Sequence, residues 1–306
     1  MRSFFLLSLA ILHLALAGPT YAQNPVAWSA YGHGLFKSQV ILDPSGNIYW
    51  VGLDSEQSSY RLHVAKYSPS GVLLGQGSTS MGVAGQPVLL PPVISGSRIY
   101  VGYGGVSSLV LAFNMNDMSR AWWQELTNIR LGGLHVSASQ VVTVEANGTA
   151  VSLQRRSLIN GTVTGTTNVT GLDYVHKTVM DNSGHVYIAG SPDGTASRLV
   201  RVNSGGSVHY DVPVNFFGYG ERYATAIAVN ESTQQVLIGY YAILSGQAAS
   251  NALLFRANKS DGSGSTWTFN ASVDDVITTI LPQIDGSVVV AMHYWDLSEV
   301  YGTRIV

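Results

Sequence analysis

Asp43-Pro-Ser-Gly-Asn-Ile-Tyr-Trp-Val-Gly52 is the stretch of this 306-residue sequence that decides the fold. It joins a polar tight turn to a short run of β-branched and aromatic residues, which is the pattern of a turn that enters a β-strand. Similar stretches recur along the chain at 95–102, 137–144, 181–190, 230–239 and 285–291. Six copies of one turn and strand predict a repeat architecture.

The spacing of these stretches matches the size of a propeller blade. Successive intervals are 51, 42, 45, 50 and 52 residues when equivalent points are taken at Ile48, Ile99, Val141, Val186, Val236 and Val288. An apolar run precedes each of these points, and further strand-like runs follow it, so that four strands fit into each unit. Four-stranded units of this length are typical of β-propellers.

The two ends of the chain predict how the ring closes. The sixth unit stops at 303–306 after its third strand, whereas the segment 26–31 belongs to no complete unit and is similar to 266–270. We therefore predict an all-β fold, a six-bladed β-propeller with four-stranded antiparallel blades, closed by the N-terminal strand joining the last blade. A β-sandwich and a seven-bladed ring are the alternatives.

Residues 1–22 have the features of a secretory signal peptide. Arg2 precedes an apolar run over 4–17, and Thr20-Tyr21-Ala22 fits a cleavage site with small residues. Because this run is shorter than the roughly 20 residues that cross a bilayer, we expect no stable membrane insertion, with an uncleaved anchor as the alternative. Residues 23–306 show no linker, so we expect a single propeller domain of a secreted, extracellular protein.

Composition excludes several classes of function. The chain has 16 Lys and Arg against 18 Asp and Glu, a net charge of −2, so we expect no nucleic-acid partner. It has no Cys, which excludes a thiolate nucleophile and Cys-ligated zinc and leaves buried cores to stabilise a monomer.

An excess of glycosylation motifs predicts a secreted glycoprotein. The Asn residues of these Asn-X-Ser/Thr sequons are Asn147, Asn160, Asn168, Asn230, Asn258 and Asn270. The alternative is a bacterial exported protein, rich in Ser and Thr, whose sequons are unused.

Three stretches resemble known propeller repeats. The stretch at 42–52 with 63–71, and the stretch at 181–190, resemble repeats of the SBBP or NHL-like families, and the stretch at 113–123 is similar to the end of a pyrroloquinoline-quinone-like repeat. The resemblance implies a propeller fold. It implies little about function, because such repeats occur in binding proteins, scaffolds and enzymes alike.

Candidate site residues lie in the loops expected on the upper face of the ring. That face collects the loops between blades and the loops between the second and third strands of a blade, where rigid scaffolds commonly carry function. The candidate ligand-binding residues are His33, Arg130, His135, Asp173, His176, Glu221, Arg222, Tyr240, Tyr241, His293, Tyr294 and Trp295. Tyr174, Lys177 and Tyr223 belong to the same loops. Ordinary solvated loop surface is the alternative for all of them.

Metal and cofactor chemistry has weak support in the sequence, and we predict no cofactor. Asp274 and Asp275 could ligate Ca²⁺, but adjacent strand residues point to opposite faces, and Ca²⁺ prefers six or more oxygen ligands. Zinc would need His33, His135, His176 and His293 to converge on the ring axis. No HExxH, GxSxG or Walker motif is present.

The sequence therefore favours a secreted, non-catalytic binding module. Its upper face would contact a glycan, peptide or surface protein, with Tyr240, Tyr241, Tyr294 and Trp295 as flat aromatic surfaces. The alternative is an extracellular enzyme of the lyase, lactonase or quinone-dependent oxidoreductase type, with a metal or cofactor on the axis. A purely structural wall or matrix protein is a third possibility.

Overall fold

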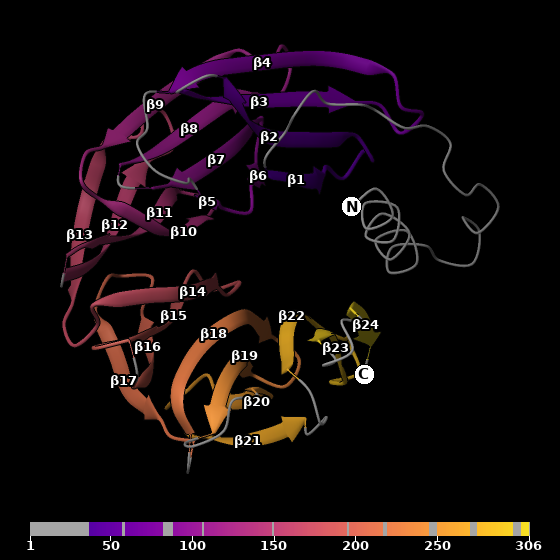
Figure 1. Ribbon diagram of the computed structural model, residues 1–306. Helices are drawn as coiled ribbons and strands as arrows, with labels where there is room; N and C mark the ends of the chain where they lie inside the picture. Colours follow the sequence, from indigo (N-terminus) through magenta and orange to yellow (C-terminus); the bar gives the residue numbers. More distant parts are fainter. Residues whose placement is uncertain are drawn as a thin grey trace.

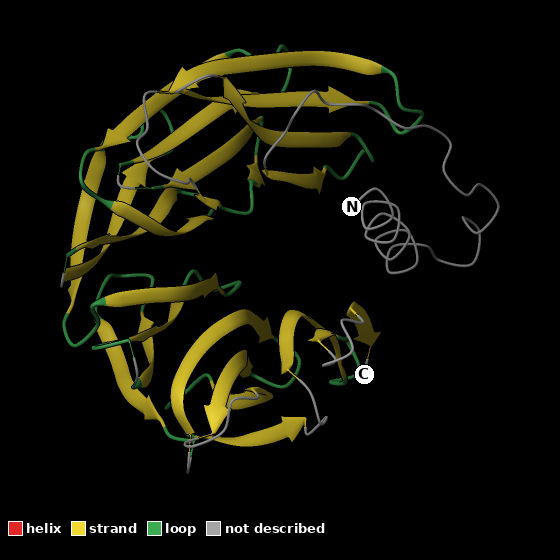
Figure 2. Cartoon of the chain, in the orientation of Figure 1, coloured by secondary structure: helices red, strands yellow, loops and turns green. Residues whose placement is uncertain are grey.

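The computed structural model describes residues 37–56, 59–81, 88–105, 107–148, 150–194, 196–216, 219–244, 250–269, 274–295 and 301–305. Within them the secondary structure is entirely β, in six antiparallel sheets that follow one another around an incomplete ring (Figures 1 and 2). The prediction of an all-β propeller built from such blades is confirmed.

The sheets, which we number as blades one to six, follow the sequence repeats. Blades one and two contain β1 (Lys37–Leu42), β2 (Ile48–Glu56), β3 (Ser59–Tyr67) and β4 (Leu73–Met81), then β5 (Val88–Leu89), β6 (Val93–Ser95), β7 (Arg98–Gly104), β8 (Ser108–Asn114) and β9 (Arg120–Leu126). Blades three and four contain β10 (Arg130–Val136), β11 (Gln140–Asn147), β12 (Ala150–Ser157) and β13 (Val163–Val169), then β14 (Tyr174–Met180), β15 (Val186–Ser191), β16 (Ser197–Val202) and β17 (Val208–Val214). Blades five and six contain β18 (Tyr219–Asn230), β19 (Gln235–Leu244), β20 (Ser250–Asn258) and β21 (Gly264–Phe269), then β22 (Asp274–Pro282), β23 (Val288–Trp295) and β24 (Tyr301–Ile305).

Strand order within the blades defines the two faces of the ring. In the four-stranded blades the strands pair in chain order, with the first near the centre and the fourth at the rim (Figure 1). Because neighbouring strands are antiparallel, the loops that join blades share one face with the loops between second and third strands. This is the upper face, and the remaining turns form the lower face.

The repeated turn is held by one aspartate. In blade one, Asp43 Oδ1 accepts the backbone N–H groups of Ser45 and Asn47, each at 2.9 Å, and its Oδ2 accepts the Tyr49 hydroxyl at 3.2 Å. Asp181 makes the same three bonds to residues two, four and six positions later. An Asp at the start of the turn therefore ties the turn to the strand that follows it.

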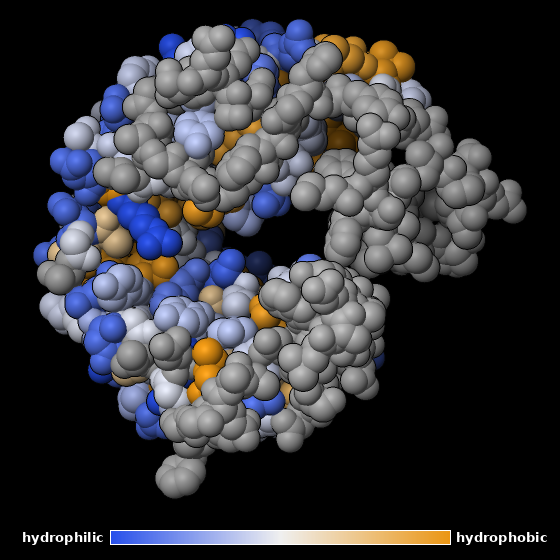
Figure 3. Space-filling view, in the orientation of Figure 1, coloured by the Kyte–Doolittle hydropathy of each residue, from blue (hydrophilic) through white to orange (hydrophobic). Residues whose placement is uncertain are grey.

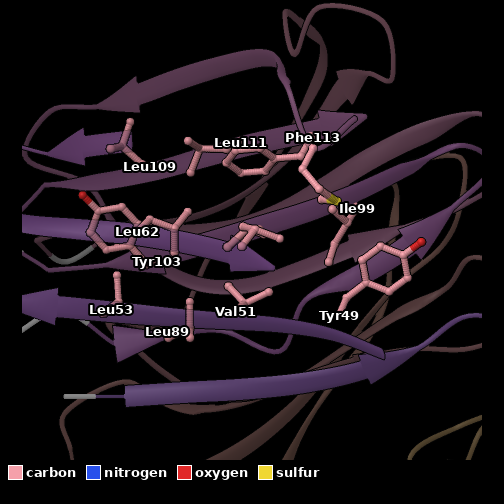
Figure 4. Packing of buried hydrophobic residues seen from close by; sticks show 13 residues of the cluster. Tyr49, Val51, Leu53, Leu62, Leu89, Ile99, Tyr103, Leu109, Leu111 and Phe113 are labelled. Carbon is pink, nitrogen blue, oxygen red and sulfur yellow. The ribbon is translucent and has the colours of Figure 1, made fainter. Parts of the chain in front are cut away.

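Neighbouring blades pack through continuous apolar layers. The layer between blades one and two contains Tyr49, Val51 and Leu53 of β2 opposite Ile99 and other residues of β7 and β8, and Figure 4 shows these side chains facing one another. One such cluster lies at each of the five junctions between consecutive blades. Blades two to five therefore bury both faces.

Glycine lets one blade approach the next closely. The repeat motif places Gly239 in β19, where a Cβ atom would lie only 2.6 Å from a methyl carbon of Ile277 in β22. Gly102 occupies the corresponding place in β7 against Leu131. At these positions any larger side chain would push two sheets apart.

The first strand of blade two is divided into β5 and β6. Pro91 and Pro92 separate the two pieces, both of which pair with β7. Proline has no backbone N–H to donate to the ladder, which accounts for the interruption. The expectation of four unbroken strands is corrected at this point.

Two predictions fall outside the described residues. The signal peptide over 1–22 and the closing strand over 26–31 both lie there, and blade six is described as the three strands β22, β23 and β24. Where the structure describes the chain, it contains no helix with the length and apolar character to cross a membrane.

The Asp43 turn predicts an acid-sensitive fold. Burial alone would raise the pKa of Asp43, but hydrogen bonds from Asn47, Tyr49 and Ser45 outweigh it and lower the pKa below its usual range. A lowered folded-state pKa adds stability that is present above the unfolded pKa of about 4 and lost as the pH falls through the folded value. Urea unfolding between about pH 5 and pH 2 should show a shallower loss of stability for Asp43→Asn than for the unmodified chain. Parallel curves would contradict this role.

The close approach at Gly239 can be tested by substitution. Gly239→Val should lower the free energy of unfolding by about 1–3 kcal/mol, because the new side chain would overlap Ile277. Gly205→Val is the matched control, since a Cβ at Gly205 would have no atom of the described residues within 4 Å, and it should change stability by about 0.5 kcal/mol or less. Urea unfolding measures both, and equal losses would show that the interface tolerates the added volume.

Candidate functional site

An aromatic and basic cluster lies where three inner strands begin at the upper face. Arg130 starts β10, Tyr174, His176 and Lys177 lie in the first four residues of β14, and Tyr223 lies near the start of β18. Tyr174 and Tyr223 are 49% and 41% exposed, and Arg130 and Lys177 are also exposed. We call these five residues the axial cluster. Figure 3 shows that the ring is hollowed at its centre.

Contacts between the inner strands hold the cluster in place. The rings of His176 and Tyr223 are 5.5 Å apart, which joins blade four to blade five. His176 Nδ1 also accepts the backbone N–H of Ala224 at 3.3 Å. Tyr241 lies directly opposite Tyr223 in the pairing of β18 with β19, so it shares the same face of the sheet.

His135 of β10 makes a similar contact at the junction between blades three and four. Its Nε2 lies 2.9 Å from the Thr178 hydroxyl of β14. Gly133 makes this contact possible, because a Cβ there would collide with Thr178. His135 thus joins blade three to blade four, as His176 joins blade four to blade five.

Electrostatics keep both imidazoles neutral. Burial lowers the pKa of His135 to about 4. Burial, followed by the positive charges of Arg130 and Lys177, lowers the pKa of His176 to about 4. Neutral imidazoles beside two cations leave the axial cluster positively charged at neutral pH.

The Arg222 side chain contacts residues that lie just before it in the chain. Its guanidinium donates to the carbonyl oxygens of Val214 at 3.3 Å and Tyr219 at 3.0 Å, and it lies 5.8 Å from the centre of the Phe216 ring. Arg222 was predicted to bind a ligand, but its guanidinium donates hydrogen bonds to backbone carbonyl groups of the protein. Asp173 lies beside the axial cluster, with its backbone N–H bonded to Ser191 O at 3.0 Å.

The placement of Tyr240 and Tyr241 on an upper loop was wrong. Both lie within β19, a continuous apolar strand that is longer than the second strands of the other blades. Tyr240 is 0% exposed and packs edge-on against Phe216 at 4.8 Å, and burial raises its pKa. Tyr240 is therefore a core residue, whereas Tyr241 is partly buried beside the axial cluster.

The loop placement of His293, Tyr294 and Trp295 was also wrong, because these residues end β23. His293 is exposed and pairs with Val276 and Thr303 in the neighbouring strands. Glu221 is a residue of β18, and His33 lies outside the described residues.

No metal site assembles among the described residues. Within them, no group of three His, Asp or Glu side chains is placed to hold an ion. His135 and His176 instead bond to neighbouring strands, and Asp275 is buried in β22. The four-histidine and paired-aspartate hypotheses therefore gain no support from their described members.

A second polar site was missed by sequence reasoning. It is a cavity on the lower face, between blades four and five, and its lining includes Asp181, His185, Arg201 and Lys259. The candidate residues predicted from the sequence all lie in segments expected on the upper face. Asp181 and His185 belong to the repeated turn of 181–190, which the sequence marks only as structural.

The neutral histidines make a direct prediction for solution measurements. The ring protons of His135 and His176 should not titrate between about pH 5 and pH 8 in an NMR pH series. Since an unfolded His has a pKa of about 6.5, the unfolded chain binds more protons below that value, and stability should fall from about pH 7 toward pH 4. A midpoint near 6.5 for either ring would contradict its burial.

Comparison with known proteins supports the fold alone. No protein-family model matches the chain, and no curated protein matches its sequence. The computationally designed propeller Ika8 has a TM-score of 0.53 at 12% identity, over 88% of this chain and 70% of that one. The extracellular domain of the putative one-component system BT4673 from B. thetaiotaomicron has a TM-score of 0.50 at 12% identity, over 86% of this chain and 32% of that one. BamB from Moraxella catarrhalis has a TM-score of 0.45 at 12% identity, over 86% of this chain and 82% of that one. The chain has the fold of a β-propeller.

Proposed function

We propose that this protein is a secreted, non-catalytic binding module that holds an acidic glycan at the axial cluster. The observation that carries the proposal is that His176 has the charges of two exposed cations, Arg130 and Lys177, and the exposed ring of Tyr223 around it. Exposed Tyr174 lies two residues before His176 on the same inner strand. Rings of this kind stack on the apolar faces of sugars, and guanidinium and ammonium groups pair with carboxylates or sulfates.

The charge balance supports an acidic ligand in preference to a neutral one. The charges that act on His176 are those of Arg130 and Lys177, and both are positive. The carboxylate of Asp173, directly before Tyr174, offsets one of them, so the cluster and this neighbour together carry one positive charge. The overall net charge of the chain is −2, so the cluster is a local departure from the average. Local positive charge on a rigid scaffold favours an anion through long-range attraction and short charged hydrogen bonds.

Rigidity also supports binding at this place. Arg130, His176 and Tyr223 lie on strands of three consecutive blades, and the strands are joined by the His135 and His176 contacts. Side chains on strands lose less freedom when a ligand binds than side chains on mobile loops. The cluster is therefore organised before any ligand arrives.

The exposure of most described sequon asparagines supports secretion as a glycoprotein. Asn147, Asn160 and Asn168 are exposed. Asn258 is also exposed, but it lines the lower cavity, so we exclude its sequon from the proposed modification sites. Asn230 is 1% exposed, and its Oδ1 accepts hydrogen bonds from Ser232 and Thr233. A glycan on Asn230 would have to be buried, so we exclude this sequon from the proposed modification sites.

The test measures glycan binding by isothermal titration calorimetry. Oligogalacturonate should bind the full chain, and neutral maltooligosaccharide should not. The double variant R130A/K177A should weaken oligogalacturonate binding by roughly tenfold or more, because it removes both charged partners. Tyr223→Ala should also weaken binding, through loss of stacking.

Arg120→Ala is the control, because Arg120 is an exposed cation at the start of the rim strand β9. It should leave binding unchanged. The proposal fails if oligogalacturonate does not bind, or if R120A and R130A/K177A reduce binding equally.

A further inference from the structure

A polar cavity of about 410 Å³ opens on the lower face between blades four and five. It is formed largely by the β14–β15, β18–β19 and β20–β21 turns, at the opposite ends of these blades from the axial cluster. The side chains that line it are Asp181, Ser183, His185, Arg201, Thr233, Gln234, Asn258, Lys259 and Ser260. All nine are polar or charged, so the cavity suits a hydrophilic molecule.

Lys259 neutralises the acidic groups around the cavity only in part. Its Nζ lies 3.1 Å from Asp181 Oδ2 and 2.6 Å from Glu231 Oε2. The side chains of Lys259 and Asp181 are 8% and 0% exposed, so this bridge between the blades is buried. The three groups together carry one negative charge, which Arg201 balances.

Arg201 has hydrogen-bonding capacity that the protein leaves unused. Its Nη1 donates to the Lys259 carbonyl oxygen at 2.5 Å, and its guanidinium lies 5.9 Å from the centre of the Tyr187 ring. Its Nε is buried and has no hydrogen-bond partner among the described residues. A buried donor without an acceptor costs free energy, which an oxygen atom of a ligand would recover.

His185 offers a second donor at the same cavity. Its Nδ1 accepts the backbone N–H of Ser204 at 3.0 Å. Burial is the main cause of a lowered His185 pKa, so the ring is neutral at neutral pH and its proton lies on Nε2. Arg201 and His185 thus give the cavity a surplus of donors.

The uncharged side chains of the lining indicate the kind of ligand that the rest of the cavity suits. Ser183, Thr233 and Ser260 contribute hydroxyl groups to the lining, and Gln234 and Asn258 contribute amides. The Thr233 hydroxyl donates to Gln235, and the Gln234 and Asn258 amide nitrogens donate to Glu231 O and Ser263 Oγ, so the oxygen atoms of these three side chains can still accept hydrogen bonds. Hydroxyls and amides both donate and accept hydrogen bonds, as do the hydroxyls of a sugar. The volume is within the range of small-molecule sites, which begins at about 300 Å³.

We propose that this cavity binds a small polyhydroxylated monocarboxylate of the sugar-acid class, with its carboxylate on Arg201 and His185. A single carboxylate suits the donors of Arg201 and His185, whereas the carboxylates of Asp181 and Glu231 would repel a dianion more strongly. The ligand would bridge two blades at a point where Lys259 already links them. This site is distinct from the axial cluster and does not depend on the glycan proposed there.

Calorimetry on the full chain with D-glucuronate, D-glucose and inorganic phosphate tests the proposal. Glucuronate should bind, and glucose and phosphate should each bind roughly tenfold more weakly or not at all. Arg201→Gln should reduce glucuronate binding by roughly tenfold or more. Circular dichroism establishes that the variant is folded.

Arg256→Gln is the matched control. In the part of the chain that the structure describes, Arg256 also has a buried Nε without a partner, but its guanidinium stacks 4.4 Å from the centre of the Trp267 ring and does not line the cavity. Equal binding of glucose and glucuronate, equal losses in R201Q and R256Q, or no glucuronate binding would each overturn the proposal.

A measurement on the unmodified chain keeps the test valid if R201Q does not fold. Glucuronate should shift the backbone NMR signals of Ser183, His185 and Ser260, and these shifts should persist in R130A/K177A, which lacks the cations of the axial cluster. Shifts confined to the axial residues would assign the carboxylate to the upper site and refute a lower one.

Discussion

The burial of both faces of the sheets at their mutual junctions is the constraint on which the structure depends. In blade three, Val141 packs toward blade two and its neighbour Val142 packs toward blade four. Successive strand residues point to opposite faces, so an apolar run such as Val141-Val142 serves two interfaces at once. A chain without disulfides can hold six small sheets in this way, because each internal sheet is covered on both sides.

This packing also positions the polar residues. Glycines at the interfaces bring the inner strands close together, and the contact of Gly133 with Thr178 lets His135 reach across to the next blade. The same stacking aligns the lower turns, so that Lys259 of blade five meets Asp181 of blade four. Both candidate binding sites thus lie at blade junctions, where residues distant in sequence are held by rigid sheets.

Much of the architecture was predictable because it is encoded locally. The turn that starts at Asp43, the glycine that follows it and the β-branched run after it belong to one short stretch, and its recurrence gave the blade boundaries. The same stretch misled the site prediction. A run such as Tyr240-Tyr241 continues a strand or starts a loop depending on how far pairing with β20 extends, and that pairing involves residues outside the run.

The sequence by itself determined the repeat, the number of strands in most blades and the residues that form the tight turns, since these depend on neighbours a few positions apart. Only the tertiary structure decided which polar residues meet. Tyr223 and His176 are 47 positions apart along the chain, and Lys259 lies 78 positions from Asp181. Their contacts follow from the rotation of one blade relative to the next, a quantity that no local pattern specifies.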